Sequence, residues 1–131
     1  MKFHTIHSLE DAYYQKAVEF YNKQLDVDFF EDSIITKRSL QNNKTENDYV
    51  LIVGIEKENI ISLATAHYEA TTNSAFLVHL LAVVDSNYDE IISQTLNEVE
   101  THLNILSNKV HARDINFLMI EVPKLRSEEH T

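Results

Sequence analysis

The sequence of 131 residues contains no cysteine and only one glycine and one proline. Without cysteine, the chain has no disulfide, no thiolate nucleophile, no iron–sulfur cluster and no cysteine-ligated zinc. The single glycine is Gly54, whereas a Walker loop and a GxGxxG turn each need several glycines to bring the backbone close to phosphate. These shortages exclude thiol chemistry and the commonest nucleotide-binding loops.

Positive charge is also scarce. Lys and Arg number 11 against 21 Asp and Glu, which gives a formal net charge of −10. This balance argues against nucleic acid and anionic membranes as partners, because both attract basic faces. The longest apolar run, Phe76 to Val84, is interrupted by His79 and is far shorter than the roughly 20 residues that span a bilayer. The opening residues, MKFHTIHS, lack the apolar core of a signal peptide, so we expect a cytoplasmic protein.

The remaining composition, 44% hydrophobic and 24% charged, is that of a globular protein, and the length predicts a single domain over residues 1–131. Apolar runs between polar turns predict five strands, at residues 2–7, 49–55, 60–68, 75–84 and 116–122. Apolar steps of three and four predict a helix at 9–25 and a second one that follows Ser86 and ends at about Asn108, with a shorter one at 34–40. We expect an α/β (α+β) fold: a mixed, mostly antiparallel sheet of about five strands with helices on both faces.

Two helix starts have the spacing of a capping box. Ser8 is followed three residues later by Asp11, and Ser86 by Asp89. This spacing predicts that Ser8 and Ser86 are the N-caps of the two long helices.

The run Leu81-Ala82-Val83, with Asp85 and Tyr88 after it, resembles the LAV-D-x-x-Y run of the Gcn5-related N-acetyltransferase (GNAT) family. The strand at 117–122 is similar to that family's next strand, and the order of elements agrees as well. The resemblance implies a GNAT-like fold, acetyl-CoA as cofactor and transfer of an acetyl group to an amine. It also implies that the backbone of Ala82, Val83 and Val84 pairs with the pantetheine arm.

One departure concerns the loop that binds the diphosphate of the cofactor. In the family this loop has the sequence Arg/Gln-x-x-Gly-x-Gly/Ala. Here Tyr88 is followed by two carboxylates and no glycine or cation, in the run Asp89, Glu90, Ile91, Ile92, Ser93 and Gln94. A carboxylate 4 Å from a phosphate costs about 1 kcal/mol in water and about 4 kcal/mol at a surface-like dielectric. We therefore expect weakened or lost acetyl-CoA binding.

A second departure concerns length. The family continues for another helix and two strands after the strand at 117–122, whereas this sequence ends at Thr131. The strand at 117–122 would then leave an open sheet edge. The sequence is therefore either a shortened member, a domain whose sheet a partner completes, or one half of a larger protein. For the open edge we expect a second copy to cover it in a homodimer.

Two ionisable residues within predicted strands are candidates for catalysis. His79 is either a general base for an amine or a core histidine bonded to a backbone carbonyl. Glu121 is either a base that positions water or an outward residue of an alternating edge strand. Glu98 and His102 share a helix side without a third ligand, so we expect no metal site.

Three functions remain open. The first is a GNAT-like acyl-CoA N-acyltransferase-related domain with weakened or lost acetyl-CoA binding. The second is an active acetyl-CoA-dependent N-acetyltransferase that acts on an unknown small amine. The third is an acidic interaction module that binds a basic protein.

Overall fold

The computed structural model describes residues 1–25 and 48–120. The predicted helix at 34–40 and the candidate residue Glu121 lie outside the described residues. Among the residues that are described, no helix is long and apolar enough to cross a bilayer.

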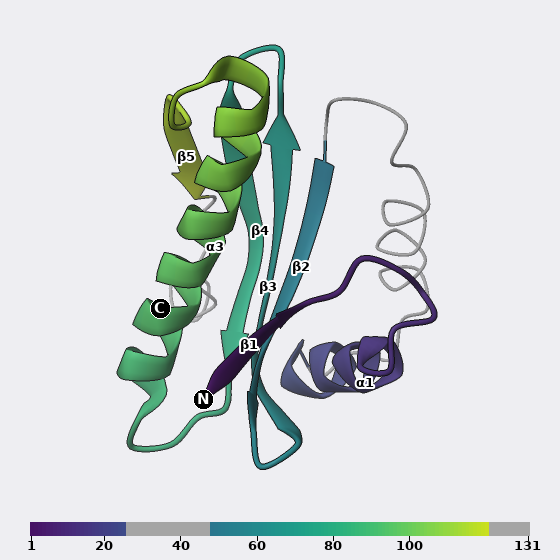
Figure 1. Ribbon diagram of the computed structural model, residues 1–131. Helices are drawn as coiled ribbons and strands as arrows, with labels where there is room; N and C mark the ends of the chain where they lie inside the picture. Colours follow the sequence, from purple (N-terminus) through teal and green to yellow (C-terminus); the bar gives the residue numbers. More distant parts are fainter. Residues whose placement is uncertain (26–47, 121–131) are drawn as a thin grey trace, which may run out of the picture.

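Five strands form one mixed sheet in the order β1-β2-β3-β4-β5 (Figure 1). The first three pairings are antiparallel and the pairing of β4 with β5 is parallel. The strands are β1 (Lys2–Thr5), β2 (Asp48–Glu56), β3 (Asn59–Glu69), β4 (Ser74–Ala82) and β5 (Phe117–Ile120). Because β4 and β5 run parallel, the chain crosses between them through a helix, as the order of predicted elements requires.

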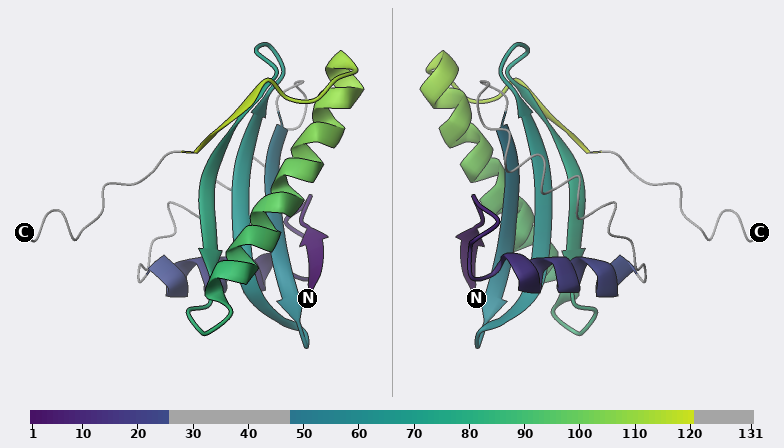
Figure 2. Two further views of the ribbon diagram at one scale, coloured as in Figure 1. Left: turned by 90° about the vertical axis from the view of Figure 1, so that its left-hand side faces the viewer. Right: turned by 90° about the vertical axis from the view of Figure 1, so that its right-hand side faces the viewer.

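The two described helices cover opposite faces of the sheet (Figure 2). They are α1 (Tyr14–Leu25) and α3 (Tyr88–His111). Beneath α3, Ala64 and Leu77 pack against Val99 and Leu103, whereas beneath α1, Leu51 and Leu63 pack with Ala17 and Phe20. Successive residues of a strand point to opposite faces, so β3 and β4 need apolar side chains on both. The predicted fold class is confirmed.

Both predicted N-caps are wrong. Helix α1 begins at Tyr14 rather than Leu9, and the Asp11 carboxylate, not Ser8, accepts the Tyr13 N–H at 2.8 Å. Helix α3 follows Asn87, which makes no side-chain cap. In both places an aspartate bonds to a backbone N–H two residues ahead, and this competing local turn overrides the capping-box spacing.

The end of α3 also differs from the prediction, because the helix continues to His111 instead of stopping near Asn108. It ends where Ala112 adopts a left-handed conformation with φ of 58°, and the Ala112 N–H bonds to the Asn108 carbonyl. A left-handed residue closes many helices, but here an alanine takes the place usually held by glycine.

Candidate functional site

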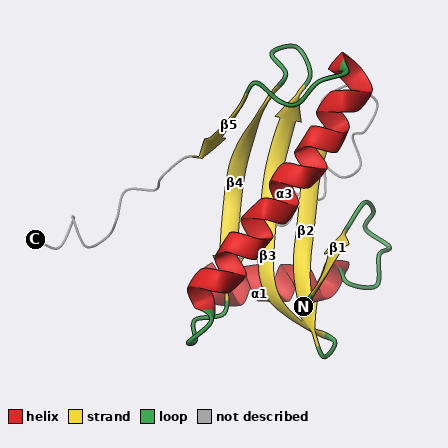
Figure 3. Ribbon diagram, turned by 60° about the vertical axis from the view of Figure 1, so that its left-hand side comes forward, coloured by secondary structure: helices red, strands yellow, loops and turns green. Residues whose placement is uncertain are grey.

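The candidate site lies where β4 and β5 separate. Thr65 of β3 pairs with His79 and Ala66 pairs with Leu77, so Val78 bulges out of β4 without a partner in β3. Strand β5 pairs with β4 only as far as Leu77. Beyond the bulge no described residue pairs with β4 on that side, and β5 turns away from it (Figure 3).

Hydrogen bonding decides which main-chain groups of β4 face this open edge. The Val83 N–H donates to the Ile61 carbonyl at 2.9 Å, so these opposed residues form a bonded pair. Bonded and non-bonded pairs alternate in an antiparallel ladder. The N–H and C=O groups of Leu80 and Ala82 therefore point away from β3, toward the open edge.

The three residues of the predicted pantetheine-pairing set lie differently with respect to this edge. Ala82 keeps its main-chain groups directed to the open edge, whereas Val83 uses its N–H to bond β3. Val84 follows the end of the strand and is 86% exposed. Leu80, which was not in the predicted set, joins Ala82 because the two residues are two apart and face the same edge.

The first turn of α3 carries the negative charge expected from the sequence. Asp89 and Glu90 are both exposed, and Tyr88 before them is 36% exposed. Ile91 is buried against the sheet and Ile92 is half-buried. Ser93 and Gln94 are exposed, and the Gln94 amide donates to the Glu90 carboxylate at 3.4 Å.

Below this turn a buried contact ties α3 to the sheet. The Thr95 hydroxyl lies 2.8 Å from the Ser62 hydroxyl of β3 and 2.7 Å from the Ile91 carbonyl. Ser62 in turn faces Gly54 of β2, where a Cβ atom would lie 2.3 Å from the Ser62 Oγ. The one glycine of the chain is thus required for close packing rather than for binding phosphate.

His79 lies between two hydroxyl groups on the α1 side of the sheet. Its Nδ1 is 2.7 Å from the buried Thr65 hydroxyl, and its Nε2 is 3.1 Å from the Tyr21 hydroxyl of α1. The Tyr21 ring meets the imidazole edge-on at 4.8 Å. Hydroxyls both donate and accept, so they satisfy the imidazole in either tautomer and when it is protonated.

The sequence does not indicate Tyr21 as the partner of His79. The residue lies on the apolar stripe of the first helix, where a tyrosine is typical of the core. The hydroxyl group of Tyr21 is the one feature that indicates a polar contact, because a buried tyrosine hydroxyl usually has a hydrogen-bond partner. That partner is 58 residues away in the sequence.

A small cavity lies beside this cluster, between α1 and the sheet. It measures about 20 Å³, close to the space of one water molecule, and Tyr14, Tyr21 and Thr65 contribute to its lining. Burial raises the pKa of the Tyr14 phenol above its ordinary value of 10.0. The apolar surroundings therefore favour the neutral form of this phenol.

Solved N-acetyltransferases have similar structures. An aminoglycoside 6'-N-acetyltransferase from Acinetobacter haemolyticus has a TM-score of 0.69 and 12% identity, over 99% of this chain and 85% of that one. A ribosomal-protein-alanine N-acetyltransferase from Brucella melitensis biovar Abortus 2308 has a TM-score of 0.57 and 15% identity, over 98% and 84%. An aminoglycoside 6'-acetyltransferase type Ii has a TM-score of 0.64 and 8% identity, over 81% and 66%.

The predicted GNAT-like fold is confirmed by these similarities. The chain spans 66% of the type Ii enzyme and 56% of an Enterococcus faecium aminoglycoside 6'-N-acetyltransferase. No protein-family model matches the sequence, and a search of curated proteins finds no match.

Proposed function

We propose that the chain is a GNAT-like, N-acyltransferase-related domain in which acetyl-CoA binding is weakened or lost. The observation that carries this proposal is the first turn of α3, where Asp89 and Glu90 are exposed. The acetyltransferase neighbours support the fold on which it rests.

The two parts of a coenzyme A molecule meet different surfaces on this fold. The open edge at Leu80 and Ala82 offers main-chain groups that suit the amides of a pantetheine arm, in the manner of an added strand. A diphosphate is favoured at a helix N-terminus, where N–H groups and the helix dipole attract negative charge. Here Asp89 and Glu90 already supply that charge, so a diphosphate is opposed.

A thermal-shift titration with acetyl-CoA tests this proposal. The wild-type chain should show no shift at millimolar acetyl-CoA, whereas bound ligand at 100 times its Kd stabilises a fold by roughly 2.7 kcal/mol. Each carboxylate within 4 Å of a phosphate costs about 1 kcal/mol in water, which is about fivefold in affinity. The double variant Asp89→Asn, Glu90→Gln should therefore bind acetyl-CoA more tightly.

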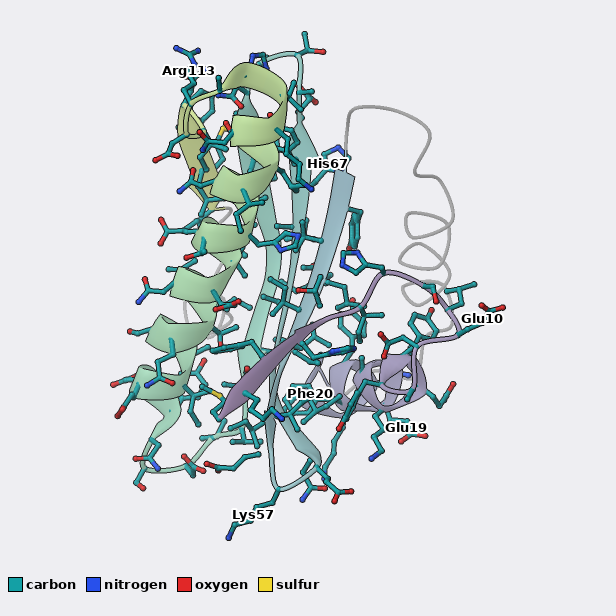
Figure 4. All side chains as sticks on the ribbon, viewed as in Figure 1. Glu10, Glu19, Phe20, Lys57, His67 and Arg113 are labelled. Carbon is teal, nitrogen blue, oxygen red and sulfur yellow. The ribbon has the colours of Figure 1, made fainter. Side chains whose placement is uncertain are left out.

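The matched control is Glu19→Gln, Glu100→Gln, which changes net charge equally at exposed positions of α1 and α3. Figure 4 shows Glu19 on α1. If the control binds acetyl-CoA as the Asp89, Glu90 variant does, the effect belongs to net charge. Tight binding of acetyl-CoA by the wild-type chain would overturn the proposal.

A second candidate function, an active N-acetyltransferase on a cationic amine, is favoured by the Thr65–His79–Tyr21 chain. Tyr21 accepts a proton from the amine as its own proton moves to His79 Nε2, and the Thr65 oxygen then accepts from the imidazolium. The net charge of −10 attracts a positively charged acceptor. Aminoglycosides, named for several structural neighbours, are acceptors of this class.

An acetylation assay with a polycationic amine tests the second candidate. Loss of a general base typically costs about 10²- to 10⁴-fold in rate, so Tyr21→Phe and His79→Gln should both abolish measurable turnover. Activity that survives both substitutions would exclude the relay. Absence of activity in the wild-type chain would contradict acetyl transfer to a polycationic amine and leave the first proposal standing.

A further inference from the structure

We propose that β4 beyond its bulge binds an extended, positively charged peptide as an added strand. The inference goes beyond acetyl-CoA binding, because it rests on the strand edge and its charge alone. The partner is a segment of protein that carries lysine or arginine residues beside a short apolar stretch.

The main-chain groups of the edge carry the first step of the argument. Leu80 and Ala82 direct two N–H and two C=O groups away from β3, and no described residue pairs with them there. Strand edges with unpaired main-chain groups are templates for another chain. The strand from Val78 to its end at Ala82 measures roughly 13 Å, enough to pair with about four residues of peptide.

Exposed apolar side chains lie along the edge. Val78 is 49% exposed, Val84 is 86% exposed and Ile120, at the end of β5, is 49% exposed. Isolated exposed apolar residues are ordinary, but these three flank one open edge. They suit a peptide with alternating small apolar side chains.

The charge at the end of the edge selects a basic partner. Asp85, Asp89 and Glu90 are exposed, and residues 78–94 contain no lysine or arginine. The one lysine of α3, Lys109, is in its last turn, and Arg113 lies at that far end of the helix (Figure 4). A negatively charged surface favours a positively charged partner and disfavours a negatively charged one.

This charge also disfavours a second copy on the same edge. A second copy joined edge to edge at β4 would bring a chain of the same net charge against this edge. Like charges placed close together oppose such an assembly, and the whole chain carries −10. A basic peptide meets the edge without that repulsion.

Titration with synthetic peptides tests the proposal. The probe is a seven-residue peptide with alternating Val and Thr at its centre and Lys at both ends, and its counterpart has Glu at both ends. The full chain should bind the Lys peptide one to one, more weakly as salt rises, and should not bind the Glu peptide. Amide hydrogen exchange should slow at Leu80 and Ala82.

Two sets of variants separate strand addition from simple attraction of charge. Asp89→Asn, Glu90→Gln should weaken binding of the Lys peptide by about threefold to tenfold, as expected for exposed ion pairs, while Glu19→Gln, Glu100→Gln leaves it unchanged. N-methylation of alternate peptide amides should abolish binding in one set and preserve it in the other, because only one edge of the peptide faces β4.

Several results would overturn the proposal. They are equal binding of the Lys and Glu peptides, tolerance of both N-methylated sets, and exchange that stays fast at Leu80 and Ala82. Self-association at micromolar concentration that slows exchange at these two amides would assign the edge to a second copy. These outcomes are independent of the acetyl-CoA titration, so the two proposals can fail separately.

Discussion

The two ends of the β4–α3–β5 unit are built in opposite ways. At the end where β4 begins, Asn73 is buried and all its polar groups are used. Its Oδ1 accepts hydrogen bonds from the Tyr68 and Ser107 hydroxyls at 2.7 and 2.6 Å, and its Nδ2 donates to the Asp114 carbonyl at 3.0 Å. Its own carbonyl accepts the Asn116 N–H at 2.7 Å.

At the other end, where β4 leads into α3, polar groups face outward. Helix α3 begins without a side-chain cap, and Asp89 and Glu90 are exposed. Buried polar groups that are fully bonded hold a fold together, whereas exposed ones are available to a ligand. We call the end at Asn73 the closed end and the end at the start of α3 the open end. The hydrogen bonds of the closed end hold β5 beside β4, whereas the exposed polar groups of the open end are available to bind a ligand.

The largest expected effect comes from breaking the closed end. Asn73→Ala leaves the Tyr68 and Ser107 hydroxyls and the Asp114 carbonyl without this partner, and places alanine at a φ of 50°. Unpaired buried groups and the strained backbone together should cost about 3 kcal/mol of unfolding free energy. Urea denaturation measures this loss.

The control for this prediction is Asn97→Ala, at an exposed position of α3. A surface substitution of this kind should change the unfolding free energy by less than about 0.5 kcal/mol. If Asn73→Ala cost no more than the control, the closed end would not be the anchor described here.

A smaller loss should follow from disturbing the contact beneath the open end. Gly54→Ala places a Cβ 2.3 Å from the Ser62 Oγ, which bonds Thr95 of α3. Overpacking of this kind costs about 1 to 3 kcal/mol. Denaturation of Gly54→Ala with and without Ser62→Gly checks the cause, because removal of the hydroxymethyl group should recover part of the loss. A double variant less stable than the sum of both single changes would contradict this explanation.

The smallest effect is a pH dependence on the α1 side. Burial raises the pKa of Tyr14 above 10.0, so above about pH 10 the phenol ionises more readily in the unfolded chain than in the folded one. The contribution of Tyr14 to stability is complete below pH 10 and is lost as the pH rises further. Tyr14→Phe should therefore lose less stability than the wild-type chain between about pH 9 and 11 in urea denaturation. Equal losses would contradict the assignment.

The order of strands and the long stripe of α3 could be predicted from the sequence, because apolar periodicity reflects burial directly. Helix starts could not, because Asp11 and Asp85 form local turns with energies similar to those of the predicted caps. The type of the turn at Lys57 and Glu58 was also hidden. Both residues have positive φ without the Asn or Gly that usually marks such a turn.

The candidate site was predictable only in part. The acidic first turn of α3 is visible in the sequence, since Asp89 and Glu90 follow the end of a strand. The direction of the Val83 N–H depends on strand register, and the Tyr21–His79 contact depends on how a helix packs on a distant strand. Register and packing are tertiary properties, which local patterns do not specify.

The most direct test of the central claim compares two ligands that differ in the nucleotide diphosphate. Calorimetric titration of the full chain with acetyl-CoA and with acetyl-pantetheine isolates the contribution of the first turn of α3. Because Asp89 and Glu90 oppose phosphate, we predict that acetyl-CoA binds no more tightly than acetyl-pantetheine. Binding of acetyl-CoA at least about tenfold tighter, a difference of about 1.4 kcal/mol, would contradict the account.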